Sequence, residues 1–405
     1  MTTHAIFFDD GRGRLEPLRD LRPIFDVRTG GLTTLERYLA AHDLALLSLF
    51  VPSEMDELTR ERHPSAAVNT LAKDAGAVLV INGRCPLPPA GFDQLAEGGA
   101  LVDPSTGDVI AAHLDAADAL RLLTGERPDM EEIGASAPDR GPLLMTRPWH
   151  VRSLRDACLE MDLRLLSRDI PHDIRHRERV TLIGREAPRV HGTARVFPGA
   201  IFNTDAGSIV VQERATVRPG AVITGPAFIG AGATVLEHAH IKAHTAIGPV
   251  CKVAGEVGGT IFQGHANKAH DGHLGDSWVG EWVNLGAGTV NSNLLNTYDE
   301  VKAVAEPGAD AEPTGQTFLG CILGDHVTTA IGTRIMTGAV AHTGVMWSAS
   351  SALSGALGRF AWVTDDGPRP YRMDKFERVM RAKMARRKAT PGEAYLARIR
   401  ELVGA

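Results

Sequence analysis

Residues 211–253 read VQERATVRPGAVITGPAFIGAGATVLEHAHIKAHTAIGPVCKV, with an aliphatic β-branched residue at every sixth position. The series is Val211, Val217, Ile223, Ile229, Val235, Ile241, Ile247 and Val253. Four residues after each stands a second, mostly small residue, such as Ala215 or Cys251. Because helices repeat apolar residues every three or four positions and half-buried strands every two, period six fits neither. It predicts a left-handed parallel β-helix, in which a short strand and a tight turn form one side of a triangular coil.

The six-residue pattern returns further along the chain, at Val279 and Leu285 and again from Leu323 to Ala341. The two intervals between these blocks are each two residues longer than a multiple of six. The spacing therefore predicts loops that leave the β-helix near residues 258–276 and 291–316. A regular solenoid that ejects loops commonly uses them for function.

The remaining sequence predicts three further parts. Residues 1–150 have the buried apolar runs and helical stretches of an α/β domain, with a hairpin at Pro104–Asp108. A helical linker is expected over 151–182, the β-helix over 183–358, and a basic helical tail over 359–405. From Arg369 onward this tail has eleven basic and four acidic residues. We expect it to be a solvated helix that packs on a neighbouring subunit, because no aromatic residues interleave as a nucleic-acid surface would need.

Composition excludes several classes of protein. The 405 residues contain 43 Lys plus Arg and 49 Asp plus Glu, a net charge of -6 that predicts no attraction to nucleic acid or anionic membranes. The four cysteines are scattered, without a CxxC pair, which argues against a disulfide framework or a cysteine zinc site. No signal peptide or membrane-spanning stretch is evident. We expect a cytoplasmic protein.

Residues 267–293, NKAHDGHLGDSWVGEWVNLGAGTVNSN, carry a family resemblance. They resemble the acetyltransferase domain of the bifunctional N-acetylglucosamine-1-phosphate uridylyltransferase/glucosamine-1-phosphate acetyltransferase family, which shows a His, then L-G-D, V-N-I-G-A-G-T and a later C-N-Y. The matching residues are His270, Leu274-Gly275-Asp276, Val283-Asn284-Leu285-Gly286-Ala287-Gly288-Thr289 and Asn293. The resemblance extends over about residues 210–345, and the whole chain resembles a divergent group of sugar nucleotidyltransferase-like proteins.

The resemblance implies CoA-dependent acyl transfer to an amine. His270 would be the general base, a role that suits imidazole because its ordinary pKa of about 6.5 leaves it neutral yet basic near pH 7. Asn293 would orient the base or the substrate. The other implied contacts are Asn284, Lys302, His273 and Asp276 for the substrate, and Ala287 and Gly288 for acetyl-CoA.

Two departures from the family lie at positions expected to touch sugar. His273 stands where the family has Tyr, and Ser292-Asn293-Leu294 stands where it has C-N-Y. The acceptor is therefore expected to differ from the family's. The alternative for His270 is a solvent-exposed loop histidine, and for Asn284 and Asn293 it is a stack of asparagines at the corners of the coil.

A different chemistry fits some of the same histidines. The pair His265-x4-His270, with His238, His240 and His244 upstream, has the spacing by which the chain resembles gamma-class carbonic anhydrases. Neutral imidazoles in that arrangement bind zinc with a water in the fourth position. This alternative gives no role to the Asn-Leu-Gly-Ala-Gly-Thr run or to the N-terminal domain.

Near the N-terminus, FFDDGRGRLEPLRDLRP resembles the glycine-rich opening of sugar nucleotidyltransferases, with Gly11, Gly13 and Arg14 at matching positions. There the turn lets backbone N–H groups approach nucleotide phosphates. Asp9 and Asp10 replace two alanines, however, and Arg84 replaces the Asp expected to bind Mg²⁺. We therefore expect a degenerate domain, in which Gly11, Gly13, Arg14, Arg28 and Arg84 contact a nucleotide or sugar phosphate, or in which those arginines are surface charges.

Together these features predict an N-acetyltransferase that acts on an amino sugar phosphate or nucleotide-linked amino sugar and serves cell envelope biosynthesis. Acetyl-CoA is the expected donor, with Mg²⁺ only if the N-terminal domain is active. The resemblance also implies a homotrimer. The alternatives are a bifunctional enzyme that also transfers a nucleotidyl group, a non-catalytic sugar-nucleotide binding protein and a zinc enzyme.

Overall fold

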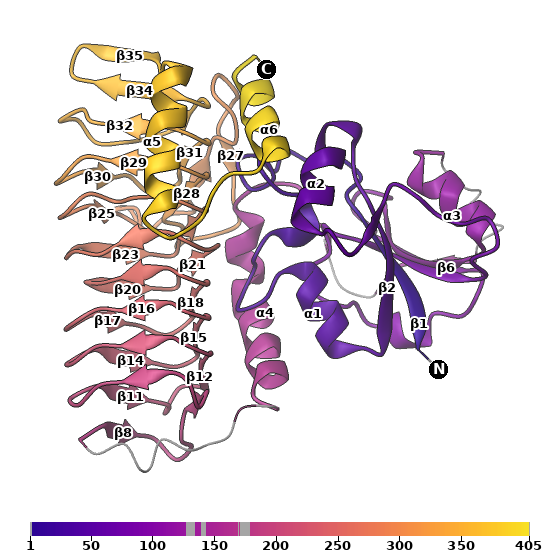
Figure 1. The fold of residues 1–405 in the computed structure, drawn as a ribbon, viewed down its shortest axis with the longest axis horizontal. Coiled ribbons are helices and arrows are strands. Elements are labelled where there is room, and N and C mark those ends of the chain that lie inside the picture. Colours follow the sequence, from indigo (N-terminus) through magenta and orange to yellow (C-terminus); the bar gives the residue numbers. More distant parts are fainter. Residues whose placement is uncertain (1, 127–133, 139–142, 169, 171–178, 405) are drawn as a thin grey trace.

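The structure, a computed structural model, describes residues 2–126, 134–138, 143–168, 170 and 179–404. It confirms the predicted fold class: an α/β domain, a long β-helix and C-terminal helices follow one another along the chain (Figure 1). Within these ranges no helix combines the length and the apolar character needed to cross a bilayer.

The N-terminal domain is built on a mixed seven-stranded sheet in the order β3-β2-β1-β4-β6-β5-β7. The strands are β1 (Thr3–Phe8), β2 (Leu44–Phe50), β3 (Ala67–Val68), β4 (Val78–Asn82), β5 (Gly99–Val102), β6 (Val109–Leu114) and β7 (Ala135–Ser136). The helices are α1 (Thr34–Ala41), α2 (Asp56–Arg62) and α3 (Ala116–Leu123), with 3-10 turns at Ile24–Asp26, Ser53–Met55 and Phe92–Gln94. The predicted hairpin joins β5 to β6, which pair antiparallel.

Strand β1 pairs in parallel with both β2 and β4, so the order of strands reverses beside β1. Open α/β sheets bind their ligands in the crevice at the carboxyl ends of the strands at such a switch point. The loops after β1 and β4 therefore meet where a ligand site is expected.

The second half of the chain forms a triangular prism. Side 1 contains β8 (Thr181–Ile183), β11 (Ile201–Asn203), β14 (Val222–Thr224), β17 (His240–Ile241), β20 (Glu256–Gly258), β23 (His273–Gly275), β25 (Val290–Asn291) and β30 (Arg334–Ile335). Side 2 contains β9 (Arg189–Val190), β12 (Ile209–Val211), β15 (Ala227–Ile229), β18 (Thr245–Ile247), β21 (Ile261–Phe262), β24 (Trp278–Val279), β28 (Cys321–Leu323), β31 (Ala339–Ala341) and β33 (Ala356–Leu357).

Side 3 contains β10 (Arg195–Val196), β13 (Thr216–Val217), β16 (Thr234–Val235), β19 (Lys252–Val253), β22 (Asn267–Lys268), β29 (Thr328–Thr329), β32 (Met346–Trp347) and β34 (Ala361–Thr364). A last strand, β35 (Gly367–Pro370), pairs antiparallel with β34. The residues of the six-residue series, from Val211 to Val253, are all fully buried and form one continuous apolar core. The period therefore placed the inward-facing residues correctly.

One of the two predicted loops is confirmed. The chain leaves the prism after β25 of side 1 and rejoins it at β28 of side 2, and between them lies a small hairpin of β26 (Lys302–Ala303) and β27 (Glu312–Pro313). The loop predicted near 258–276 is wrong. There the prism continues through Val257, Phe262, Lys268 and Leu274, which lie in register with the inward-facing residues of neighbouring coils. In this stretch some sides of the prism are shortened at glycine turns, and Lys268 interrupts the apolar pattern. The six-residue count therefore fails although the prism continues.

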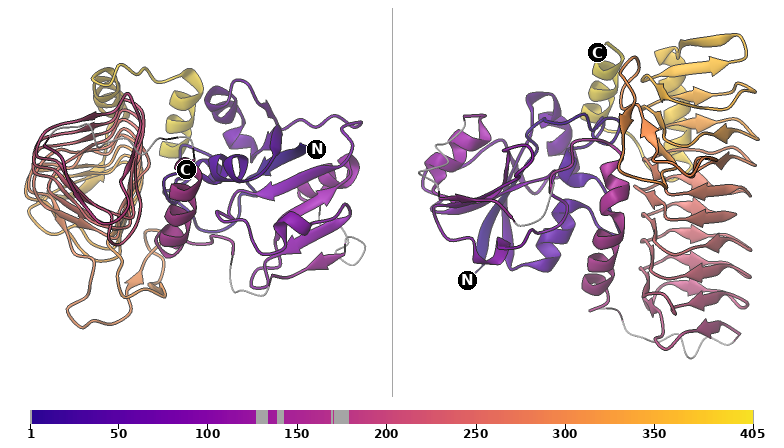
Figure 2. Two further views of the ribbon diagram at one scale, coloured as in Figure 1. Left: turned by 90° about the horizontal axis from the view of Figure 1, so that it is seen from below. Right: turned by 180° about the vertical axis from the view of Figure 1, so that it is seen from behind.

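The N-terminal domain packs on side 2 of the prism. Helix α4 (His150–Leu166) runs along that side, and the ribbon views show it between the prism and the N-terminal sheet (Figures 1 and 2). Apolar residues of the loop 15–27, of α4 and of side 2, among them Phe228 and Trp278, form one buried cluster. Arg37 of α1 donates to both carboxylate oxygens of Asp162 in α4 over 2.6 and 2.8 Å, and both side chains are fully buried. The domain is thus fixed to the prism by buried contacts.

The C-terminal tail forms α5 (Met373–Ala385) and α6 (Glu393–Gly404). The sequence predicts that the tail packs on another subunit, but its apolar residues pack within this chain. Phe376 and Met380 of α5 and Leu396 of α6 are buried in the cluster that includes the core of the N-terminal domain. Glu61 of α2 accepts hydrogen bonds from the backbone N–H groups of Ala394 and Tyr395 in the first turn of α6, over 3.0 and 3.3 Å.

Candidate functional site

His270 lies at the corner where side 3 of the prism turns into side 1, between β22 and β23, and it is exposed. The turn 269–272 lies directly against the turn 286–289 of the next coil. The two turns are so close that a Cβ atom on Gly272 would collide with the carbonyl oxygen of Thr289. Ala287 and Gly288 belong to that second turn. The structure therefore brings His270, Ala287 and Gly288 together at one corner.

Beyond His270 this corner is built from small residues. Gly288 has a φ of +69°, a conformation that side chains with a Cβ rarely adopt, and the backbone N–H of Gly332 in the following turn donates to the carbonyl of Ala287 over 2.7 Å. Ile331, in the same following turn, is 80% exposed. The corner thus has a narrow, mostly apolar surface, against which a slender aliphatic chain fits.

Asp276 and Asn293 lie at the opposite end of side 1, where it turns into side 2. Asn293 Nδ2 donates to Asp276 Oδ2 over 2.8 Å. The other oxygen of Asp276 accepts from Arg155 of α4 over 2.7 Å and lies 3.1 Å from Arg152. This pair therefore ties α4 to the prism, and its predicted contact with substrate stays a prediction.

His273 lies on the outer face of side 1 between these two corners. Its Nδ1 lies 3.4 Å from Glu256 Oε1, and Glu256 also pairs with Lys242. The hydrogen bond from Lys242 is the main reason why the pKa of Glu256 is below its usual value. His273 and Asn293 both approach Gly275, each within 2.7 Å of the position that a Cβ atom would take there. They form a continuous polar surface on side 1.

Two predicted site residues lie elsewhere. Asn284 is on side 3, where its Oδ1 accepts from Asn267 Nδ2 over 2.9 Å, and its predicted contact with substrate stays a prediction. Lys302 is exposed in the loop that follows Asn293, and its neighbours Val301 and Ala303 pack against Trp149. It therefore lies at the end of side 1 remote from His270.

The histidine pair proposed for zinc is not brought together. His265 is at the corner between sides 2 and 3, where its ring stacks on Trp282 with 4.3 Å between centroids. It lines a cleft of about 480 Å³ between the N-terminal domain, the prism and the C-terminal helices. Strand β22 separates it from His270. In the described part of the chain, no three His, Cys, Asp or Glu residues are grouped to hold a metal ion.

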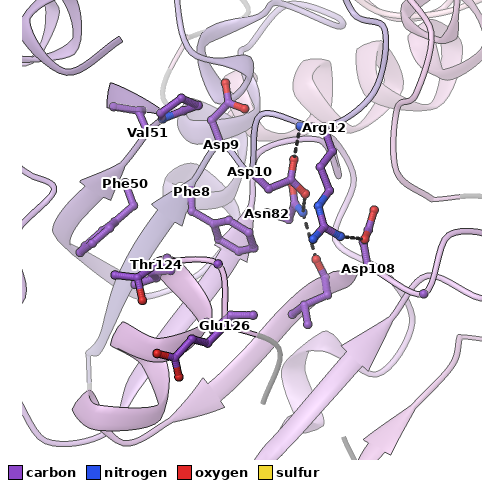
Figure 3. A pocket seen from close by; sticks show the side chains of 16 residues that line it. Phe8, Asp9, Asp10, Arg12, Phe50, Val51, Asn82, Asp108, Thr124 and Glu126 are labelled. Carbon is purple, nitrogen blue, oxygen red and sulfur yellow. Dashed lines mark hydrogen bonds and ion pairs between the residues drawn. The ribbon is translucent and has the colours of Figure 1, made fainter. Parts of the chain in front are cut away.

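A second cavity, of about 310 Å³, lies at the switch point of the N-terminal sheet. Its walls include Phe8, Asp10, Arg12, Phe50 and Asp108 (Figure 3). Arg12 pairs with Asp108, and its backbone N–H donates to Asp10 Oδ1 over 3.0 Å. Arg12 and Asp108 were not singled out from the sequence; the Gly-Arg-Gly spacing at residues 11–13 was the available signal for the arginine.

Arg84 stands where the resemblance implies an Asp that would bind Mg²⁺. Its guanidinium is 1% exposed and donates to both oxygens of Asp10, over 2.9 and 2.5 Å, and to Asp108 over 2.7 Å. Burial alone would raise the pKa of Asp10, but the hydrogen bonds and charge of Arg84 hold it below its usual value. The opposite charges of Asp10 and Arg84 therefore compensate each other. A Mg²⁺ ion does not fit where this guanidinium lies.

The remaining nucleotide-binding candidates do not line the cavity. Gly11 and Gly13 shape the loop with φ values of +67° and +82°. Arg14 reaches toward Glu312 of the prism loop, at 3.3 Å, and Arg28 pairs with Glu36. These ion pairs are what the alternative expects of the arginines, and their contact with a phosphate stays a prediction.

We expect Arg84→Ala to lower the free energy of unfolding by about 1–3 kcal/mol, because the partly buried Asp10 is left without its cation. In the variant, Mg²⁺ should raise Tm, since Asp10 loses its guanidinium partner and its carboxylate can offer the oxygen ligands that Mg²⁺ prefers. The measurement is thermal unfolding with and without millimolar MgCl₂. Arg60→Ala, which removes an exposed pair with Asp56, is the control and should change little. A rise of the wild-type Tm with Mg²⁺ would contradict this account.

Comparison with known proteins supports the resemblance. Residues 5–170 match the family described as sugar nucleotidyl transferase. The bifunctional protein GlmU of Cyanothece sp. is 31% identical over 35% of this chain and 30% of its own length, and that of Nostoc sp. is 29% identical over 38% and 39%. The resemblance to a divergent GlmU-like family is therefore confirmed, although the chain spans less than two fifths of these relatives. A candidate acetyltransferase structure from Bacillus cereus aligns with 56% of this chain and 98% of its own, at 11% identity, but its TM-score of 0.22 supports no conclusion.

Proposed function

We propose that the protein is a CoA-dependent N-acyltransferase that acts on an amino sugar phosphate or a nucleotide-linked amino sugar. One observation carries the proposal: His270 is exposed at a corner of the prism directly beside the bare turn of Ala287 and Gly288. A proton acceptor and a surface for a slender thioester arm are thus adjacent. The match of residues 5–170 to the sugar nucleotidyl transferase family supports a sugar as the acceptor.

Acetyl-CoA supplies the acyl group as an activated thioester. His270 accepts the proton that the acceptor amine loses as its nitrogen bonds to the thioester carbonyl, and it can return that proton to the departing thiolate. Ala287 and Gly288 hold the arm close to the imidazole because neither of them carries a side chain larger than a methyl group. His273 and Asn293 continue the surface along side 1, where the sugar is placed.

A homotrimer is part of the proposal. Side 2 is covered by α4 and the N-terminal domain, while the corner of His270 is uncovered and carries the exposed Ile331. An exposed Ile beside a candidate active site is consistent with a site completed by a second copy of the chain. The subunit stoichiometry is measured directly by light scattering.

For the N-terminal domain we propose a role other than catalysis. Because Arg84 occupies the expected magnesium position, we favour a scaffold or a binding domain without turnover over a nucleotidyltransferase. The 310 Å³ cavity at the switch point supports ligand binding there.

The test is release of free thiol from acetyl-CoA with a panel of amino sugar phosphates and nucleotide-linked amino sugars. Amine-dependent release supports acyl transfer and identifies the acceptor class. No release with any acceptor, together with no thermal shift by acetyl-CoA, would rule the proposal out. Pyrophosphate release that requires Mg²⁺ would instead show nucleotidyl transfer, and activity lost with a chelator would show a zinc enzyme.

A further inference from the structure

Lys268 occupies a position that belongs to the apolar interior of the prism. In strand β22 it pairs in register with Val253 of the preceding coil, one of the fully buried inward-facing residues of side 3. Lys268 itself is 2% exposed. A lysine at such a position is costly, because an ammonium group loses its hydration when it is buried.

The Lys268 ammonium group contacts backbone carbonyls. Its Nζ donates to the carbonyl oxygens of Ala254 over 2.9 Å, of His270 over 3.2 Å and of Gly272 over 2.7 Å. Its three N–H donors are therefore matched by three acceptors. Two of these belong to the turn 269–272, which carries the exposed His270.

The same turn is seated tightly on its neighbours. A Cβ atom on Gly255 would lie 2.9 Å from the carbonyl oxygen of Gly272 and 3.0 Å from Asp271 Cα, so the turn rests on the preceding coil. On its other side Gly272 meets Thr289. The hydrogen bonds from Lys268 hold the turn from the interior of the prism. The contacts with the adjacent coils fix the position of the turn along the prism axis.

We propose that Lys268 is a positioning residue that holds the His270 turn from inside the prism, so that the imidazole lies beside Ala287 and Gly288. This inference rests on the proposed function of His270. An apolar side chain would fill the interior equally well, as Val253 does one coil away, so the need for hydrogen bonds to the turn explains the lysine. A displacement of about 1 Å at a reacting group can lower a rate by about 10²-fold.

Burial lowers the pKa of Lys268 to about 8, while Asp271 and Glu256, the charged groups that act on it, favour its ammonium form. Below about pH 8 the ammonium group of Lys268 has all three of its N–H donors. As the pH rises through 8 the amine keeps two N–H groups for three carbonyls, and the turn loosens. The proposal therefore predicts a loss of kcat above pH 8 in the wild-type protein.

The experiment compares Lys268→Met with Lys252→Met, which removes an exposed lysine of β19 one coil away on the same side. For Lys268→Met we expect kcat to fall by about 10- to 100-fold, with KM and Tm close to wild type. The variant should also lack the decline of kcat above pH 8. Lys252→Met should match the wild type in every respect.

Lys268→Leu is the second variant if the methionine variant is poorly folded, because Leu285 occupies the equivalent interior position of the next coil. Unchanged kcat in a folded variant would overturn the proposal, as would a fall in kcat that merely follows a fall in Tm. Crystal structures of both proteins supply a readout that needs no activity. If the wild type transfers no acyl group, the proposed function fails, and a turn 269–272 left in place in the variant would overturn the role of Lys268 as well.

Discussion

Replacing His270 with alanine is expected to lower kcat for acyl transfer by about 10²- to 10⁴-fold, the usual contribution of a general base. The side chain is exposed, so its loss should leave Tm within about 1 °C of the wild type. KM for acetyl-CoA should change little, because the surface formed by Ala287 and Gly288 remains. The measurement is the thiol-release rate at saturating donor and acceptor.

His238→Ala is the matched control for that measurement. His238 is also exposed, at the same corner of the prism two coils before His270, and away from the turn of Ala287 and Gly288. Its replacement should leave kcat unchanged. Equal losses in the two variants would point to a general effect on the prism, and full activity of His270→Ala would remove His270 as the base.

The six-residue period predicted the prism because its inward-facing residues are set by the local geometry of each coil. The prediction failed between Val253 and Val279 for two physical reasons. Short glycine turns, such as the one at Gly255, remove residues from some sides, and Lys268 places a charge among apolar positions. The six-residue period therefore predicts a loop that leaves the prism here, whereas the pairing of strands between coils continues through the stretch.

The candidate site was partly readable from the sequence. The motif around His270 and the turn of Ala287 and Gly288 are close in the chain and proved close in space. The contacts of Asp276 with Arg155 and of Asp10 with Arg84 join residues that are 121 and 74 positions apart. No local pattern reports such pairs, so the sequence alone predicts a substrate contact for Asp276 and an anion-binding role for Arg84 without their ion-pair partners.

The largest loss of stability is expected from Arg22→Met. Arg22 and Asp325 have fully buried side chains joined over 2.7 Å, and Glu281 lies 3.3 Å from the same guanidinium nitrogen. These contacts hold the loop of the N-terminal domain on the prism. Removing the cation leaves the fully buried Asp325 carboxylate without its partner, beside a Glu281 that keeps only Arg62, and this costs about 3–5 kcal/mol. The change is measured as a fall in Tm, with Arg164→Met, which breaks an exposed pair with Glu160, as the control.

The loss should depend on pH in a defined direction. Burial raises the pKa of Asp325 already in the wild-type protein, and removing Arg22 raises it further. Since the folded variant then holds a proton that the unfolded chain releases, its stability falls as the pH rises through the folded-state pKa. Arg22→Met should therefore be less stable at pH 8 than at pH 6. Adding Asp325→Leu should recover much of the loss, because an apolar group of similar size needs no partner. If the double variant is no more stable than Arg22→Met, the unpaired carboxylate is not the cause, and packing of the N-terminal loop against the prism must be responsible.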